Sequence, residues 1–122
     1  MQYETITYAV QDAVAIVTLN RPEVKNALNT RMRAEITDAV LAAGDEARVL
    51  VITGTTGAFC SGQDLGGNVS AATLDVERVL HEEYEPMLLA IHNSKIPTIA
   101  AVNGVAAGAG ASLALATDVV IA

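Results

Sequence analysis

The chain has 122 residues, 52% of them hydrophobic, and carries a net charge of −7. This length suits one modest domain, and the apolar content is too high for a disordered segment. The negative charge argues against a nucleic-acid partner, because such a surface needs a basic patch.

The single cysteine, Cys60, excludes an internal disulfide and fits a reducing cytoplasm. We interpret it as a small buried apolar side chain, because no histidine or lysine lies near it in the sequence. The histidines, His81 and His92, are isolated, so no metal site is predicted. An uncharged run over 96–117 is long enough to cross a bilayer, but proline, asparagine and glycine residues divide it. No membrane partner is therefore expected.

The first elements in chain order are predicted as strands over 3–9 and 13–19, with a turn at Gln11-Asp12. A connecting loop then leads to a helix that begins with Asn29 or Thr30 as its cap and ends at Gly44.

A short buried strand is predicted over 48–53, followed by a long glycine-rich loop of the kind that is usually functional or mobile. The next helix lies near 73–92, where Pro86 should kink or interrupt it. Its apolar stripe is formed by Val76, Leu80, Tyr84, Met87 and Ile91. Its acidic run of Glu82, Glu83 and Glu85 is interpreted as a solvated face.

Two further strands, 97–103 and 118–122, flank a helix that opens with "AGASLALA". The resulting order of elements predicts an α/β domain with a largely parallel sheet. The last strand is apolar and is expected to be buried on both faces. We therefore expect residues 1–122 to be the N-terminal portion of one longer domain, with the remainder supplied by the same protein or by another chain.

Two predicted strands run into glycine-rich loops, one after Gly54 and one after Gly104. Ligands bind at the carboxyl ends of strands in open α/β sheets, and small residues let an oxygen approach the main chain closely. Two such loops side by side would present two N–H donors to one oxyanion. The alternative is that these residues only allow helix and sheet to pack closely. A dinucleotide-binding loop could begin at Gly108, but Leu113 stands where its third glycine belongs.

Three segments together resemble the enoyl-CoA hydratase/isomerase (crotonase) superfamily, and specifically its N-terminal half. They are "VAIVTLNRPEVKNALN", "VLVITGTTGAFCSGQDL" and "KIPTIAAVNGVAAGAGASLALATDVVIA". The resemblance implies a crotonase-like ββα spiral and an acyl-CoA thioester as substrate. It implies no cofactor besides coenzyme A within that substrate, and a trimer or hexamer of the full-length protein.

The resemblance also implies roles for individual residues. The backbone amides of Gln63 and Ala109 would bind the thioester oxygen. Arg21 and Lys25 could meet phosphates, or they could be solvated surface charges. Substrate-binding positions carried over in this way are Val24, Asn26, Ala27, Leu28, Ser61, Asp64, Leu65 and Gly108. We interpret Asp64 as a hydrogen-bond acceptor that organises its loop rather than as a base.

The chain departs from the family hydratases at Ser112, which occupies the position of a catalytic glutamate. Hydration needs two carboxylates, so this substitution puts direct hydration in doubt and leaves a one-base proton transfer or isomerisation open. The closest branch by resemblance contains the phenylacetate-pathway ring-1,2-epoxyphenylacetyl-CoA isomerase. The alternatives left open are hydration by residues outside this chain, a non-catalytic acyl-CoA-binding or assembly half-domain, and a dinucleotide-binding domain.

Overall fold

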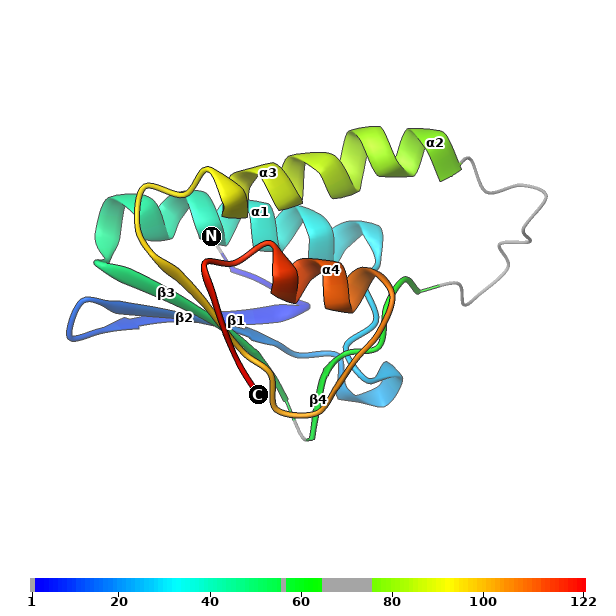
Figure 1. Cartoon of the computed structure of the whole chain (residues 1–122), viewed down its shortest axis with the longest axis horizontal. Coiled ribbons are helices and arrows are strands. Elements are labelled where there is room, and N and C mark those ends of the chain that lie inside the picture. Colours follow the sequence, from blue (N-terminus) through cyan, green and yellow to red (C-terminus); the bar gives the residue numbers. More distant parts are fainter. Residues whose placement is uncertain (1, 56, 65–75) are drawn as a thin grey trace.

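The computed structural model describes residues 2–55, 57–64 and 76–122. It is an α/β structure whose helices α1 (Thr30–Glu46) and α3 (Glu85–His92) lie together over one face of a five-stranded sheet (Figure 1). The predicted order of the main strands and helices is confirmed, although two short strands were not predicted, and the main sheet is largely parallel.

The chain begins with an antiparallel hairpin of β1 (Ile6–Gln11) and β2 (Val14–Leu19). Gln11 pairs with Val14, so the connecting turn consists of Asp12 and Ala13, one residue later than predicted. Both turn residues have positive φ angles, 53° and 66°. This left-handed pair matches the twist of the strands that it joins.

Helix α1 (Thr30–Glu46) follows a single 3-10 turn, η1 (Pro22–Val24). Its predicted cap is confirmed, because the Asn29 side chain accepts a hydrogen bond of 2.8 Å from the Met32 N–H. The predicted end at Gly44 is wrong. The helix continues two residues further, and the Ala47 N–H still donates to the Ala43 carbonyl.

The main sheet has the strand order β1-β2-β3-β5-β7. Its strands β3 (Val49–Gly54), β5 (Thr98–Ala101) and β7 (Val119–Ile121) run parallel to β2. The carboxyl ends of β3 and β5 therefore lie side by side. Asn103 joins them, because its side chain accepts from the Gly54 N–H at 3.1 Å and donates to the Gly54 carbonyl at 2.8 Å.

The long loop after β3 contains a strand that was not predicted, β4 (Ala58–Cys60). It pairs in parallel with β6 (Val105–Ala106), which precedes helix α4 (Ala109–Leu115), and forms a second small sheet. The pairing brings the two glycine-rich loops together.

The helix predicted near 73–92 consists of α2 (Val76–Val79), a π-helical turn η2 (Leu80–Tyr84) and α3 (Glu85–His92). Its predicted residues 73–75 lie outside the described part. The interruption expected from Pro86 is confirmed, since the π turn ends two residues before it. The wider turn also shifts the predicted apolar stripe. Leu80 is exposed, and the buried side chains include Val79.

The core lies between the sheet and the helices. Its largest fully buried side chains include Phe59, Leu19, Leu28, Met32, Ile36, Leu50, Ile52, Met87, Ile91 and Leu113. All three residues of β7 are exposed, so residues 1–122 do not themselves supply the burial on both faces that the sequence predicts for this strand. None of the helices among the described residues combines the length and the apolar character of a membrane-spanning segment.

Candidate functional site

The candidate site is formed where the two glycine-rich loops leave β4 and β6. The Ala107 N–H donates to the Cys60 carbonyl at 3.1 Å and extends the pairing of the two strands. Gly110 then packs directly on Cys60, where a Cβ would lie 2.8 Å from the cysteine Cβ. The absence of a side chain at Gly110 thus permits the close approach of α4 to β4.

The first loop is held by a parallel bridge between Leu28 and Gln63. The Leu28 N–H donates to the Gly62 carbonyl at 2.7 Å, and the Asp64 N–H donates to the Leu28 carbonyl at 2.9 Å. N–H groups of successive residues in an extended segment point to opposite sides. The Gln63 N–H therefore points away from Leu28.

The second loop places Ala109 at the start of α4. Gly108 before it has φ 53°, in the left-handed region that glycine adopts without strain. As the first residue of the helix, Ala109 has an N–H with no partner inside the helix. Across the loops, a Cβ built on Gly62 would lie 4.0 Å from the Ala109 nitrogen, so the two segments are neighbours.

Within the described part of the chain, neither the Gln63 N–H nor the Ala109 N–H donates to another protein group. The next residue in each loop does donate a main-chain hydrogen bond. The Asp64 N–H donates to the Leu28 carbonyl, and the Gly110 N–H donates to the Ala107 carbonyl at 2.8 Å. Gln63 in the first loop and Ala109 in the second thus each offer a main-chain donor that is uncommitted within the described residues.

Ser112 lies on α4, three residues after Ala109, and is exposed. Its N–H donates to the Gly108 carbonyl at 3.1 Å, as an ordinary helical residue does. Residues 98–117 contain no aspartate or glutamate, so α4 and its loop supply no carboxylate.

Asp64 accepts a hydrogen bond of 2.9 Å from Nη2 of Arg21, while Nη1 of Arg21 donates to the Ala27 carbonyl at 2.5 Å. The predicted role of Asp64 as an acceptor that organises its loop agrees with this contact. Arg21 was expected as a phosphate ligand. Instead, Nη1 and Nη2 of its guanidinium donate to groups within the protein, and its side chain is only 17% exposed.

The segment 24–28 contributes both interior and surface residues. The Asn26 side chain is buried and donates to the carbonyls of Ala58 and Phe59, so it ties this loop to β4. Leu28 and Ala27 are also buried, whereas Val24 and Lys25 are exposed.

Ser61 links the two segments, because its hydroxyl donates to the Val24 carbonyl at 3.0 Å and its N–H donates to the Lys25 carbonyl. Leu65, predicted as a substrate-binding residue, lies outside the described residues. Within the described residues, no cluster of three or more His, Cys, Asp or Glu side chains could hold a metal ion. A groove between α1 and the helix of residues 76–92 lies elsewhere and contains none of the predicted site residues.

Comparison with known proteins places the chain in a family. Residues 9–122 match the model of the enoyl-CoA hydratase/isomerase family. Over its whole length the chain is 58% identical to a Rhodobacter capsulatus protein named "Probable enoyl-CoA hydratase". The match covers 47% of that protein. The chain is also 40% identical to the 1,2-epoxyphenylacetyl-CoA isomerase of Escherichia coli. That match covers 98% of this chain and 47% of the isomerase. The chain belongs to the enoyl-CoA hydratase/isomerase family.

Solved structures agree with this assignment. A crystal structure of an enoyl-CoA hydratase/isomerase from Xanthobacter autotrophicus Py2 superimposes with a TM-score of 0.88 at 35% identity. The match covers 98% of this chain and 46% of the other. The crotonase-like fold expected from the sequence is thus confirmed. The chain spans about half the length of the relatives that it matches.

Proposed function

We propose that this chain forms the thioester-binding site of an acyl-CoA enzyme, in which the Gln63 and Ala109 N–H groups bind the thioester oxygen. The observation that carries the proposal is the pair of uncommitted main-chain donors on two loops joined by β4 and β6. Family membership supports an acyl-CoA thioester as the ligand.

The chemistry of such a site follows from where charge develops. Removing a proton beside a thioester, or adding water to its conjugated alkene, places negative charge on the thioester oxygen. Fixed donors at that oxygen stabilise the charge without reorganising, and loss of one donor typically costs on the order of 10²–10³ in rate. Because these donors belong to the main chain, the two glycine-rich loops could stabilise the charge although they contain few acidic or basic side chains.

The surrounding segments suit the rest of an acyl-CoA molecule. Val24 and Lys25 are exposed beside the Ser61 contact, and we assign the coenzyme A portion to this surface. Asn26, Ala27 and Leu28 would act mainly from the interior, by holding the backbone that shapes the surface. Gly108 and Ser61 would border the acyl group from the two loops.

We infer that the reaction is a proton transfer or isomerisation rather than direct hydration. Ser112 replaces the family glutamate, and 98–117 offer no other carboxylate. The hydroxyl of Ser112 is exposed and could hydrogen-bond substrate or water. Similarity to an epoxyphenylacetyl-CoA isomerase supports an aromatic acyl-CoA in phenylacetate breakdown, with fatty acyl-CoA degradation as the second candidate. Rapid hydration of crotonyl-CoA by the full-length protein would contradict this inference.

The full-length protein is proposed to act as a homo-oligomer in the cytoplasm, with coenzyme A present as part of the substrate. The lone buried Cys60 supports a reducing compartment. Analytical ultracentrifugation of the full-length protein tests the oligomer.

NMR spectroscopy of the full-length protein, with ¹⁵N-labelled amides, tests the central proposal. Phenylacetyl-CoA should move the Gln63 and Ala109 amide proton resonances downfield together, because both donate to one oxygen. Free coenzyme A, which lacks the thioester carbonyl, is the matched control and should leave these two resonances in place. The proposal is overturned if the thioester binds and neither resonance moves. Binding without turnover would favour the alternative of a non-catalytic acyl-CoA-binding protein.

A further inference from the structure

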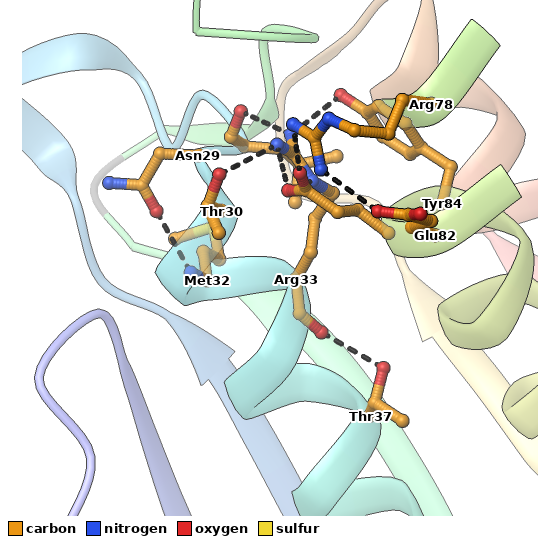
Figure 2. A network of polar contacts seen from close by, with 10 residues as sticks. Asn29, Thr30, Met32, Arg33, Thr37, Arg78, Glu82 and Tyr84 are labelled. Carbon is orange, nitrogen blue, oxygen red and sulfur yellow. Dashed lines mark hydrogen bonds and ion pairs between the residues drawn. The ribbon is translucent and has the colours of Figure 1, made fainter. Parts of the chain in front are cut away.

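A buried arginine lies beside the first loop of the candidate site. The side chain of Arg33, on α1, is 5% exposed and enters a polar cluster between α1 and the helix of residues 76–92 (Figure 2). Its Nη1 donates to the Leu28 carbonyl at 3.0 Å and to the Tyr84 hydroxyl at 3.1 Å. Its Cζ lies 4.5 Å from the centroid of the Tyr84 ring.

The charge of Arg33 is balanced by Glu83. Oε1 of this carboxylate accepts from Nε of Arg33 at 3.0 Å and from Nη2 at 2.6 Å. Burial raises the pKa of Glu83, but hydrogen bonds from Arg33 and Thr30 and the nearby positive charges outweigh it and hold the pKa below its usual range. Glu83 is thus an anion within the protein and not part of the solvated acidic run that the sequence suggested.

The polar cluster is connected to the candidate site by the Leu28 carbonyl. The Leu28 carbonyl that accepts from Arg33 also accepts from the Asp64 N–H, and the Leu28 N–H donates to Gly62. These two Leu28 bonds flank Gln63 and set the direction of its N–H. Arg33 therefore holds the peptide against which the Gln63 amide is oriented.

We propose that Arg33 is a positioning residue for the oxyanion-binding amide of Gln63, acting through the Leu28 carbonyl. The inference rests on the proposed function, because the amide needs orienting only if it binds the thioester oxygen. Hydrogen bonds to Glu83 and Tyr84 hold the planar Arg33 guanidinium in place. The guanidinium in turn holds the Leu28 carbonyl in position. A lysine could not satisfy these acceptors together, since its single ammonium lacks the fork of an arginine.

A buried ion pair often contributes little net stability. A positioning role of Arg33 can therefore be tested separately from a structural role, by replacing both partners of its ion pair. Replacing both partners of such a pair by apolar side chains of similar volume is often neutral or stabilising. The double variant Arg33→Met/Glu83→Met should therefore fold while it lacks the donor to Leu28. Arg33→Lys is the conservative single variant, and Arg31→Lys is the control, because Arg31 lies on the same helix with a side chain 54% exposed.

The experiment measures the infrared carbonyl stretch of bound phenylacetyl-CoA, ¹³C-labelled at the thioester, in the full-length protein and its variants. The wild type and Arg31→Lys should lower the stretching frequency equally, relative to the free thioester. In Arg33→Lys and in the double variant the shift should be clearly smaller. Their kcat should fall by about tenfold to a hundredfold with KM near the wild-type value, as expected when a group contacting the reacting atoms is slightly misplaced.

The outcomes separate the two proposals. If the wild type does not lower the carbonyl frequency of a bound thioester, the two-amide site is overturned. If the wild type lowers it and the folded double variant lowers it equally, the positioning role of Arg33 is overturned while the site stands. A melting temperature of the double variant at or above that of the wild type, with a reduced shift, supports the positioning role over a structural one.

Discussion

Gly110 and Cys60 are in such close contact that a Cβ on Gly110 would overlap the cysteine carbonyl oxygen and lie 2.8 Å from the cysteine Cβ. The obstacle is main chain of β4, which cannot rotate away as the end of a flexible side chain could. This contact sets how near α4 lies to β4, and hence the separation of the Gln63 and Ala109 donors.

Gly110→Ala should lower the free energy of unfolding by about 1–3 kcal/mol, as overpacking of a filled interior does. Denaturant titration measures the change. Gly44→Ala is the matched control, because a Cβ there would contact only the Lys95 side chain, at 3.8 Å or more. That helical substitution should instead stabilise the protein by about 0.5–1 kcal/mol. Equal effects of the two variants would contradict the close packing of Gly110.

Ala109→Pro removes one proposed donor with little cost to the fold. Proline is well tolerated at the first position of a helix, where the N–H has no helical partner. We expect kcat/KM of the full-length protein to fall on the order of 10²–10³-fold, the usual effect of losing one oxyanion donor. Ala109→Gly keeps the N–H and should retain most of the activity. Comparable losses in the two variants would show that the side chain matters instead.

The stability of the protein should depend on pH through Glu35. This buried carboxylate accepts from the N–H groups of Glu4 and Thr5 at 3.0 and 2.8 Å, and so fastens the segment before β1 to α1. Burial raises the pKa of Glu35, but these hydrogen bonds and those from the Thr5 hydroxyl and Arg31 outweigh it and hold the pKa below its usual range.

The lowered pKa means that folding favours the carboxylate over the acid. The contribution of Glu35 is therefore complete above the unfolded pKa, about 4.3, and is lost as the pH falls through the folded value. At pH 7, Glu35→Gln should be less stable than the wild type by about 1.5–3 kcal/mol, typical of hydrogen bonds to a charged group. The difference should shrink below pH 4 in denaturant titrations. A difference that stays constant down to pH 3 would contradict the assignment.

Cys60 should be chemically inert in the folded protein. Its side chain is fully buried, and burial raises the pKa of the thiol, opposed only in part by a backbone hydrogen bond with Gly62. Because the thiolate is the reactive form, a disulfide reagent should label the native protein very slowly at pH 7. In denaturant, the Cys60 thiol should react at once. Rapid, complete labelling of the native protein would show that β4 is exposed.

The sequence was sufficient for the order of the main elements, because β2 and β3 are apolar segments rich in β-branched residues and α1 carries apolar residues at helical spacing. It did not reveal β4 and β6, which have three and two residues and are paired across 47 positions, from Ala58 to Val105. Pairing of this kind depends on tertiary structure and leaves no local pattern. The end of α1 was missed because hydrogen bonding carried the helix past Gly44.

The polar cluster was missed for a different reason. Glu82 and Glu85 are exposed, as a solvated run should be, but Glu83 lies between them on the inner side of the helix. The available signal was its spacing, since Val79, Glu83 and Met87 recur every four residues on the face that packs inward. A charged residue in that series should be matched with an opposite charge on the facing helix, here Arg33.

The two proposed oxyanion donors, the N–H groups of Gln63 and Ala109, belong to the main chain, and this determines which mutagenesis strategies can test them. Alanine scanning shortens side chains but leaves every peptide nitrogen in place, so it would pass over positions 63 and 109 without a signal. Proline scanning, or replacement of single amides by esters, is the approach that can reveal them.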